Sequence, residues 1–486
     1  MPFDDLTKFL QAAADAGELE RIMLPLSPDQ EIAALTHQIC REFQAQSPVI
    51  LFEQPTGGCC PVVTNLLGNR SRFLRLLGVE GFDEVIERLR WVFSLIPAHR
   101  DWKFGLNRSG QADRGKFTPR SIRRGLSQQV VKLGKEIDLT QLPVLRSWSG
   151  ESGPMITAGQ VITESSTGAP ALEQMPLEVL DEQTLQLHWN PSGPTFRHWQ
   201  ERCQDQRQLP VAISLGGDPL LSYAASLPIP GWIDPWFLTG VLRNEGYNLV
   251  RARSVELNVP AEAEMILEGY LDTTLPIGAG AAAGANGILQ HHQNLPQLKL
   301  TALTHRANPV FPARIQALDV SEELVCSQLT EQLLLGILRL TQPSALDLHL
   351  PACGGHRDVV FVRTSATTSQ EVQQLFHALC SLPFISPTGL IVAVGAEVDL
   401  RDETAVWREV CLSRSSSRQL AARLEMGHQQ RLLLDATSAA LGENAARRCL
   451  PAPEILDRLA GQFGNSSWDG LETPVSVQAD QHPALP

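Results

Sequence analysis

The sequence lacks the cysteine spacings on which small metal-bound or disulfide-linked domains depend. Its nine cysteines include no Cys-x-x-Cys pair and no spacing typical of a zinc site. This pattern argues against a zinc ribbon and against a disulfide framework. We expect free thiols, which the cytoplasm would keep reduced.

Long apolar runs and an excess of basic residues are also missing. No stretch reaches the roughly 18 apolar residues of a membrane span, and nothing at the amino terminus has the pattern of a secretion signal. There are 40 Lys and Arg against 53 Asp and Glu, for a net charge of −13, whereas phosphate binding depends on clustered basic side chains. We therefore expect a cytoplasmic protein with no membrane span and no nucleic-acid partner.

The length of the chain predicts several domains. At 486 residues, 43% of them apolar, it exceeds the size at which one hydrophobic core keeps growing. Residues 1–115 combine amphipathic helical patterns, such as 82–93, with a buried-strand pattern at 48–52. This combination predicts an amino-terminal α/β domain.

The remaining residues divide into three parts. Residues 125–315 contain short β-branched or alternating segments between Gly, Pro, Ser and Asp clusters, which predict a β-rich barrel. Residues 320–465 return to helices alternating with apolar strands and predict a carboxy-terminal α/β domain. Residues 466–486 show little periodicity, and we expect a flexible tail. The predicted fold class is mixed α/β.

A succession of motifs runs through the chain and carries a family resemblance. It resembles the UbiD family of reversible decarboxylases in the order and spacing of Trp148-Ser-Gly-Glu-Ser-Gly-Pro-Met-Ile-Thr-Ala-Gly-Gln-Val-Ile-Thr163, Leu187-His-Trp189, Val211-Ala-Ile-Ser-Leu-Gly-Gly-Asp-Pro219, Val259-Pro-Ala-Glu-Ala-Glu-Met-Ile-Leu-Glu-Gly269 and Thr304-His-Arg306. Leu433-Leu-Asp-Ala-Thr437 is similar to the family's late Asp-Ala-Thr motif. The resemblance covers most of the chain.

For an active member, the resemblance implies a central split β-barrel that holds prenylated FMN through a divalent metal such as Mn²⁺. The modified ring would bond to an aromatic or α,β-unsaturated carboxylic acid and accept the electrons released as carbon dioxide leaves. This is carboxy-lyase chemistry. We expect a homo-oligomer, or a hetero-oligomer with a catalytic UbiD family subunit.

The positions where the resemblance implies metal ligands hold unsuitable residues. The family's Asn falls on Ala171, its His on Ser192 and its Glu on Pro235. A methyl group or a proline ring cannot ligate a hard cation, which needs oxygen donors, and a hydroxyl is a poor substitute for imidazole. Glu173 and Asp234 stand beside these positions, and we consider them as substitute ligands.

The positions of the family's reactive side chains are altered as well. An Arg is implied at Pro176, and two acidic residues are implied at Ile277 and Ala282. None of the three supplies a guanidinium or a general acid. The scaffold therefore resembles the family while its reactive residues are missing.

Four side chains remain candidates for holding the cofactor. Gln174 lies between two altered positions, and Arg431 falls where the resemblance implies a phosphate-binding Lys. Arg431 could bind phosphate bidentately or be an ordinary surface arginine. His188 and Trp189 could contact the flavin, with the indole stacked on it, or could instead line the core of the barrel.

Two further features have simpler interpretations. The glycines from Gly278 to Gly287 do not follow the spacing of a nucleotide-binding motif, so we expect a flexible loop in place of the family's acidic loop. His291 and His292 are adjacent, and adjacent side chains on regular structure point in different directions. We therefore expect a solvent-exposed turn there rather than a metal pair.

Three hypotheses about function follow. The chain is a divergent decarboxylase with changed cofactor contacts, or it is a non-catalytic homologue, a pseudoenzyme that serves an active family member as a structural or regulatory subunit. The third hypothesis is a small-molecule-binding protein that reuses the pocket without covalent chemistry. A fold alone does not decide among them, because function resides in the site.

Overall fold

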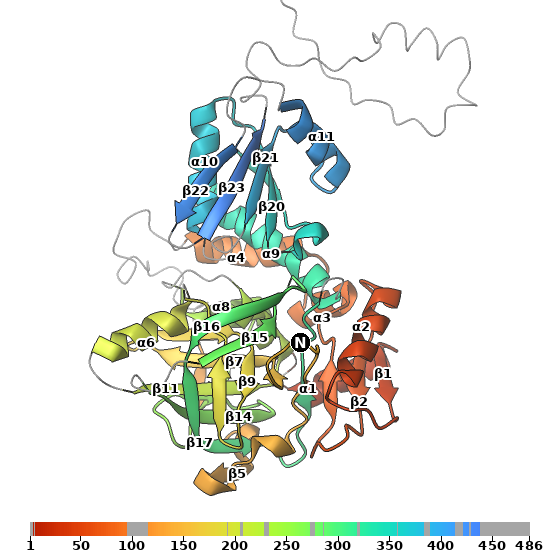
Figure 1. Cartoon of the computed structure of the whole chain (residues 1–486), viewed down its shortest axis with the longest axis vertical. Helices are drawn as coiled ribbons and strands as arrows, with labels where there is room; N and C mark the ends of the chain where they lie inside the picture. Colours follow the sequence, from red (N-terminus) through yellow and green to blue (C-terminus); the bar gives the residue numbers. More distant parts are fainter. Residues whose placement is uncertain are drawn as a thin grey trace, which may run out of the picture.

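The structure is a computed structural model of the whole chain. It describes residue 3 and residues 5–94, 115–191, 193–204, 208–227, 233–272, 278–284, 286–317, 321–356, 358–382, 389–413, 421–426 and 429–437. Figure 1 shows an amino-terminal group of elements beside a large central sheet, with a carboxy-terminal sheet above them and the helices α4 and α9 between.

The amino-terminal elements surround a four-stranded sheet with the order β1-β2-β3-β18. Strand β18 comes from far along the chain and pairs in parallel with β3. Helix α1 begins after Asp5, whose side chain accepts a hydrogen bond from the main-chain N–H of Lys8. The elements are α1 (Leu6–Asp15), β1 (Leu19–Ile22), α2 (Glu31–Phe43), β2 (Val49–Phe52), β3 (Val62–Thr64), α3 (Arg70–Leu77), α4 (Phe82–Ser94) and β18 (Phe311–Pro312).

In the described part of the chain, the central sheet has nine strands in the order β6-β9-β10-β17-β14-β11-β7-β8, with β5 also paired to β17. Neighbouring strands in it are antiparallel, and the sheet curls into a half-barrel (Figure 1). Its strands are β5 (Val130–Leu133), β6 (Met155–Ile156), β7 (Gly159–Glu164), β8 (Pro170–Gln174), β9 (Leu177–Val179), β10 (Thr184–Leu187), β11 (Leu209–Leu215), β14 (Met265–Leu271) and β17 (Gln297–His305).

Helices and smaller strands are inserted around this half-barrel. A hairpin and a second, three-stranded sheet with the order β13-β12-β4 complete the described β-structure of the region. The inserted elements are β4 (Arg120–Ile122), α6 (Pro194–Gln204), α7 (Pro219–Ser226), α8 (Pro235–Arg243), β12 (Asn248–Arg251), β13 (Asn258–Pro260), β15 (Gly278–Ala283) and β16 (Leu289–Leu295).

The carboxy-terminal elements form a five-stranded sheet with the order β19-β20-β21-β23-β22 among the described residues. Strands β20, β21 and β23 are parallel, and both edge strands are antiparallel to their neighbours. The elements are α9 (Ser321–Arg339), β19 (Ala345–His349), β20 (Val359–Thr364), α10 (Ser369–Ser381), β21 (Leu390–Val394), α11 (Glu403–Ser413), β22 (Ala421–Met426) and β23 (Gln429–Ala436).

The predicted fold class, mixed α/β with a central split β-barrel, is confirmed, and the barrel is observed as a curled half-barrel sheet. The central region is less purely β than expected, because α6, α7 and α8 are inserted between its strands. Two of these helices begin at an Asp-Pro pair: Asp218 and Asp234 each accept a hydrogen bond from a main-chain N–H in the first turn. An acidic N-cap followed by proline is a recognisable helix start. The predicted domain boundaries stay predictions, and residues 466–486 lie outside the described residues.

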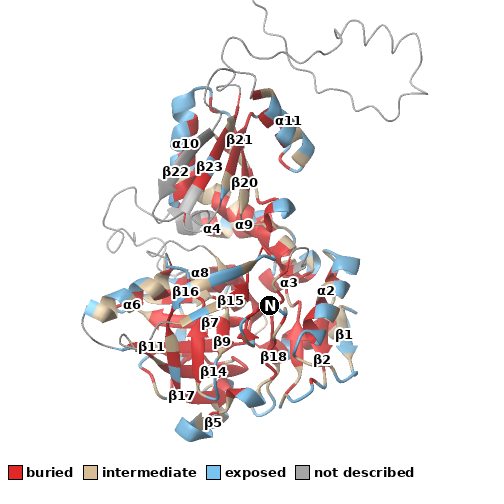
Figure 2. Cartoon of the chain, in the orientation of Figure 1, coloured by how far each residue is buried: buried red, intermediate tan, exposed pale blue. Residues whose placement is uncertain are grey.

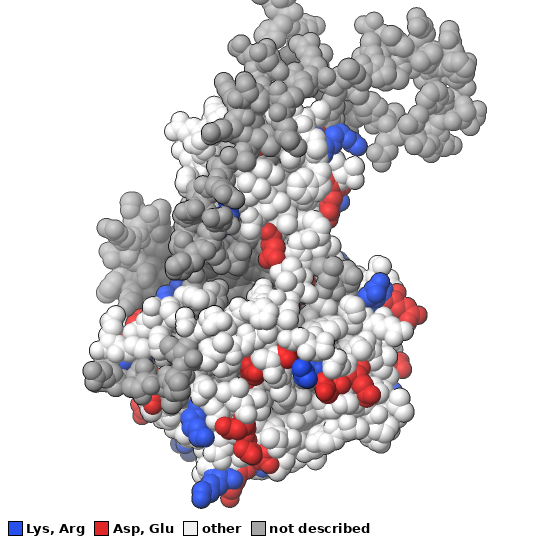
Figure 3. Space-filling model, in the orientation of Figure 1, with Lys and Arg blue, Asp and Glu red and all other residues white. Residues whose placement is uncertain are grey.

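The hydrophobic core follows the sheets. Figure 2 shows the strands of both large sheets as mostly buried, while the outer faces of α2, α6 and α10 are exposed. On the face drawn in Figure 3, Lys and Arg side chains are scattered among Asp and Glu rather than gathered into one patch. Within the described ranges, no helix has both the length and the apolar character to cross a membrane.

A buried charge cluster ties the central sheet to helix α9. The main-chain N–H of Arg314 donates to Thr157 Oγ1 (3.0 Å), and its Nη1 donates to Gln174 Oε1 (3.1 Å). The same guanidinium contacts Glu323 through Nη2 (2.5 Å) and Glu322 through Nε (3.8 Å). Burial works against the charge, but the two carboxylates raise the pKa of Arg314 above its ordinary value. Arg314 is therefore the cation that pairs with both carboxylates of α9 where this helix meets the central sheet.

Replacing Arg314 tests the role of this pairing. In Arg314→Met, Glu322 and Glu323 lose their shared cation, and breaking a buried pair costs about 3 kcal/mol or more. The matched change Arg251→Met removes an exposed pair with Glu256 (side chains 61% and 88% exposed), which contributes less than about 1 kcal/mol. Urea unfolding of both variants measures the difference. Equal losses would contradict a structural role for the cluster.

Candidate functional site

Strand β8 carries the first of the altered positions. Ala171 pairs with Thr163 of β7, and Glu173 pairs with Val161. Ala171 is buried and offers only a methyl group. Residues two apart on a strand share a face, so Glu173 projects from the same face as Ala171 and is the nearest carboxylate on that strand.

The Glu173 carboxylate is hydrogen-bonded to the main chain at the start of helix α6. Its Oε2 accepts a hydrogen bond from the main-chain N–H of Thr195 (3.2 Å), in the first turn of α6. Its Oε1 lies so close to Gly193 that a Cβ there would collide with it. Burial raises the pKa of Glu173, opposed by the hydrogen bonds from Thr195 and the charge of Arg197. A carboxylate at this end of a helix also meets the positive end of the helix dipole.

Asp234 has a similar role at helix α8. Its Oδ1 accepts hydrogen bonds from the main-chain N–H groups of Trp236 (2.8 Å) and Phe237 (3.4 Å). Pro235, where the resemblance implies a Glu ligand, is the first helical residue and is buried. Ser192 lies outside the described residues. Both substitute carboxylates that the sequence suggested are therefore helix caps.

Gln174 and Trp189 also make contacts within the half-barrel and its covering helix. Gln174 donates from Nε2 to the carbonyl oxygen of Thr157 (2.9 Å) and accepts from Arg314. Trp189 is 5% exposed and packs edge-on against Phe196 (5.1 Å between ring centroids) and Trp199 (5.2 Å) of α6. These contacts favour the core interpretation of Trp189 over a stacking platform.

Arg431 lies in another part of the fold. It is buried on β23 of the carboxy-terminal sheet, and its Nη1 donates to the carbonyl oxygen of Cys380 (3.3 Å) in the last turn of α10. A cation at the carboxy-terminal end of a helix is favourable. Arg431 is thus a buried residue rather than the surface arginine of the simpler interpretation, and its role in phosphate binding stays a prediction.

The structure does bring together a polar group on β9 and β10. Glu178 and Gln186 are directly opposite each other on these antiparallel strands. Glu178 Oε2 accepts from Gln186 Nε2 (2.9 Å) and lies 3.1 Å from His188 Nε2, with side-chain exposures of 7% for Glu178 and 0% for His188. A carboxylate at Nε2 selects the tautomer in which Nδ1 is an acceptor. That Nδ1 is buried without a hydrogen-bond partner among the described residues.

The glycine-rich segment forms a hairpin over this polar group, which corrects the expected flexible loop. Strand β15 pairs antiparallel with β16, and Gly280 is opposite His292. A Cβ on Gly280 would meet Glu178 Oε2 (2.8 Å), His188 Cε1 (2.9 Å) and Ser152 Oγ (2.9 Å). Only glycine allows the strand to approach so closely, and this approach explains the composition of the segment.

The prediction of a turn at His291 and His292 is wrong, because both lie on β16. Their side chains do differ in direction: His291 is exposed, while the ring of His292 meets that of His188 edge-on at 5.3 Å between centroids. Ala282 is buried on β15, and Ile277 lies outside the described residues. The sequence pointed to His188 but missed Glu178 and Gln186, which a cross-strand pairing of 177–179 with 185–187 would have found.

The side chains that the structure describes at the implied positions do not fit a metal-tethered flavin. Among the residues that the structure describes, no group of three or more His, Cys, Asp and Glu could hold a metal ion. The nearby carboxylates of Glu173 and Asp234 already accept main-chain hydrogen bonds at helix starts. These bonds fix one oxygen of each carboxylate at a helix start, and neither carboxylate belongs to a group of described side chains that could surround a divalent cation.

Taken together, the curled antiparallel sheet and the α/β units beside it define a multi-domain protein of mixed α/β architecture. Three family models match: the amino-terminal domain of 3-octaprenyl-4-hydroxybenzoate carboxy-lyase over residues 10–89, its Rift-related domain over 120–317 and its carboxy-terminal domain over 325–418. The chain belongs to the UbiD family, as the sequence motifs predicted.

Relatives and solved structures agree on the fold. An uncharacterized protein of Aquifex aeolicus is 29% identical over 472 residues, covering 94% of this chain and 95% of that protein. The vanillic acid decarboxylase of Sedimentibacter hydroxybenzoicus in closed form has a TM-score of 0.79 at 19% identity, covering 96% and 100%. An evolved dimeric form of HmfF from Pelotomaculum thermopropionicum, in complex with prFMN, has a TM-score of 0.73 at 22% identity, covering 93% and 98%.

Substitution of Gly280 tests the close packing of the hairpin. Gly280→Ala forces a methyl group into Glu178, His188 and Ser152, and overpacking of this kind costs about 1–3 kcal/mol. Gly81 has nothing within 4 Å of an added Cβ, so Gly81→Ala should change stability by less than about 0.5 kcal/mol. Denaturant unfolding compares the two variants. A Gly280→Ala protein as stable as the Gly81→Ala protein would contradict the packing described.

The pH dependence of stability tests the bonding of Glu178. Burial alone would raise its pKa, but hydrogen bonds from His188, Ser152 and Gln186 hold the pKa below its ordinary value of 4.5. A carboxyl group whose pKa is lower in the folded state stabilises the fold above its unfolded pKa and loses this effect as pH falls. Wild-type stability should therefore drop as pH falls below about 4.5, and Glu178→Gln should flatten that drop.

At pH 7, Glu178→Gln should lose about 1–3 kcal/mol, because hydrogen bonds to a charged acceptor are removed. Glu182 is exposed, and Glu182→Gln serves as the control that retains the wild-type acid dependence. Thermal unfolding between pH 3 and pH 7 measures all three proteins. A Glu178→Gln profile parallel to that of the wild type would refute the assignment.

Proposed function

We propose that this chain is a non-catalytic member of the UbiD family, which acts as a structural or regulatory subunit beside a catalytic family member. The observation that carries the proposal is the use of Glu173 and Asp234 as helix caps. Those are the two carboxylates nearest to the positions where metal ligands are implied. Each is held at a helix start through one oxygen, and among the described residues neither is part of a group that could hold a metal ion.

The substituted positions support the same conclusion. Ala171 and Pro235 supply no oxygen from their side chains, and a hard divalent cation needs oxygen ligands. Pro176 lacks the charge and the donors with which an Arg orients a carboxylate. Ala282 cannot transfer a proton, a contribution of about 10²–10⁴-fold where a positioned acid is present.

The assembly of similar proteins supports a partner. One similar structure of the Sedimentibacter decarboxylase, ShVdcCD, includes a truncated form of a component named ShVdcD. The evolved HmfF form is a dimer. We propose that this chain likewise works in a homo-oligomer or in a hetero-oligomer with a catalytic UbiD family subunit.

One observation favours a second candidate function, the binding of an aromatic or α,β-unsaturated carboxylic acid. Glu178 orients His188 so that Nδ1 is a buried acceptor without a partner among the described residues. Such an acceptor suits the O–H of a phenol or of a protonated carboxyl group. A divergent decarboxylase would start from this same pair, with His188 and Glu178 as its proton-handling groups.

Cofactor content tests the proposal. We expect that the chain, co-expressed with a flavin prenyltransferase and purified in the presence of Mn²⁺, carries no stoichiometric flavin or manganese, because Ala171 and Pro235 supply no ligand and the described residues include no group that could hold a metal ion. Absorbance spectra, metal analysis and mass spectrometry of the released cofactor measure this, with HmfF as the positive control. Stoichiometric prenylated FMN would contradict the non-catalytic assignment.

Two further measurements separate the candidates. Co-expression with the catalytic UbiD family chain of the same genome should give a complex in size-exclusion chromatography if the chain is a subunit. Calorimetric titration with 4-hydroxybenzoate should show binding that His188→Asn abolishes if the second candidate is correct. A stable protein that does neither would contradict both candidates.

A further inference from the structure

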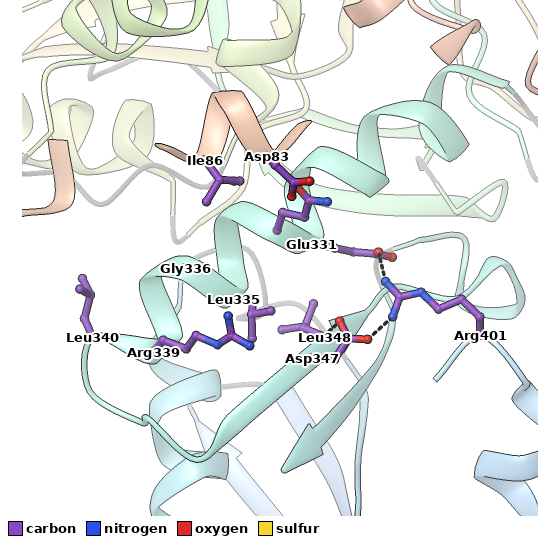
Figure 4. A pocket seen from close by; sticks show the side chains of 11 residues that line it. Asp83, Ile86, Glu331, Leu335, Gly336, Arg339, Leu340, Asp347, Leu348 and Arg401 are labelled. Carbon is purple, nitrogen blue, oxygen red and sulfur yellow. Dashed lines mark hydrogen bonds and ion pairs between the residues drawn. The ribbon is translucent and has the colours of Figure 1, made fainter. Parts of the chain in front are cut away.

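A cavity outside the central sheet carries an inference that is independent of the proposed function. It has a volume of about 520 Å³ and lies where α4 faces α9 and β19. Pockets of about 300–1,000 Å³ accommodate small organic ligands. Figure 4 shows Asp83 and Ile86 of α4 on one side of it and Leu335 and Arg339 of α9 on the other.

The spacing of residues along α9 explains why this face lines a cavity. Gln332, Leu335, Gly336 and Arg339 all line it. Residues three, four and seven apart share one face of a helix. Gly336 contributes no side chain, and Gln332 and Arg339 are separated by seven residues, or about 10 Å along the axis. The face thus has a polar residue at each end and no side chain at Gly336 between them.

The charged wall of the cavity is neutralised internally. Arg401 contacts Glu331 (3.1 Å) and Asp347 (2.6 Å), as Figure 4 also shows. Glu331 additionally accepts from His349 Nδ1 (2.7 Å) and from the main-chain N–H of Leu350 (2.8 Å). Arg363 Nη2 also lies 3.9 Å from Asp347, so two arginines balance the two carboxylates of this wall.

Two charged lining residues have no partner of opposite charge among the described residues. Arg339 donates from Nε to the carbonyl oxygen of Ala345 (2.9 Å) and from Nη2 to that of Leu346 (2.5 Å), which fixes its guanidinium but leaves its charge unpaired. Asp83 makes no hydrogen bond or ion pair with any described residue. Gln332 adds a buried Oε1 without a hydrogen-bond partner in the described structure.

We propose that this cavity binds an α-amino acid with an apolar side chain. The ligand's carboxylate pairs with Arg339, which can donate through two nitrogens. Its ammonium group donates to the carboxylate of Asp83, which supplies acceptors only. Its side chain packs against Ile86, Leu335 and Leu348, which also line the cavity.

Binding of L-phenylalanine to the full chain tests the proposal. Ligand-observed NMR or calorimetry should give a dissociation constant of about 1 mM or tighter, in line with a ligand of this size. Two analogues each lack one end: 3-phenylpropionate has no amine and 2-phenylethylamine has no carboxylate. Each should bind about tenfold more weakly, because a hydrogen-bonded charge is lost.

Matched variants assign each end of the ligand. Arg339→Met should weaken L-phenylalanine about tenfold and leave 2-phenylethylamine unchanged. Asp83→Asn should weaken L-phenylalanine and leave 3-phenylpropionate unchanged. Arg120 is exposed and does not line the cavity, so Arg120→Met should change none of the three affinities.

Three results would overturn the proposal. The first is the absence of L-phenylalanine binding up to about 10 mM. The second is equal affinity for the amino acid and its two analogues. The third is an equal loss of all three ligands in Arg339→Met or in Asp83→Asn, which would indicate a structural role for the substituted side chain rather than contact with one end of the ligand.

Discussion

A carboxylate taken out of water has to be hydrogen-bonded or paired, and this constraint determines what the central sheet of the chain can hold. Glu178 is bonded by Gln186 of β10 and by His188 just beyond it, and the partly buried Glu173 is bonded by the start of α6. Glu322 and Glu323 share Arg314. Each acid takes its donors from the chain itself. In the described part of the half-barrel, these carboxylates are therefore satisfied by donors of the protein itself.

The hairpin β15–β16 and helix α6 cover the half-barrel, and their positions follow from the hydrogen bonds of Glu178 and Glu173. Hydrogen bonds hold the polar group of Glu178, Gln186 and His188 in place. A strand can pack against this group only at a residue without a side chain, and β15 has Gly280 at that point. Trp189 is enclosed by the aromatic rings of α6, whose first turn is bonded to Glu173. Helix, hairpin and sheet thus depend on a few polar contacts.

The sequence predicted the elements whose signals are local. A buried strand was expected at 48–52 and an amphipathic helix at 82–93, and the structure has β2 and α4 there. The Gly-Ala hairpin has no apolar periodicity, and its pairing depends on contacts with distant strands, so it was missed. In the same way, the substituted residues at the implied site positions are visible in the sequence itself. The hydrogen-bond partners of Glu173 and Gln174 are not, because they are distant in the sequence.

The central claim is that the carboxylates near the altered positions hold the starts of α6 and α8 and do not ligate a metal. Anomalous X-ray diffraction at the manganese edge, on crystals soaked in MnCl₂, tests it most directly. The account predicts no anomalous peak within ligand distance of Glu173 or Asp234, with the first turns of α6 and α8 unchanged. A peak coordinated by either carboxylate, with its helix cap broken, would contradict the account.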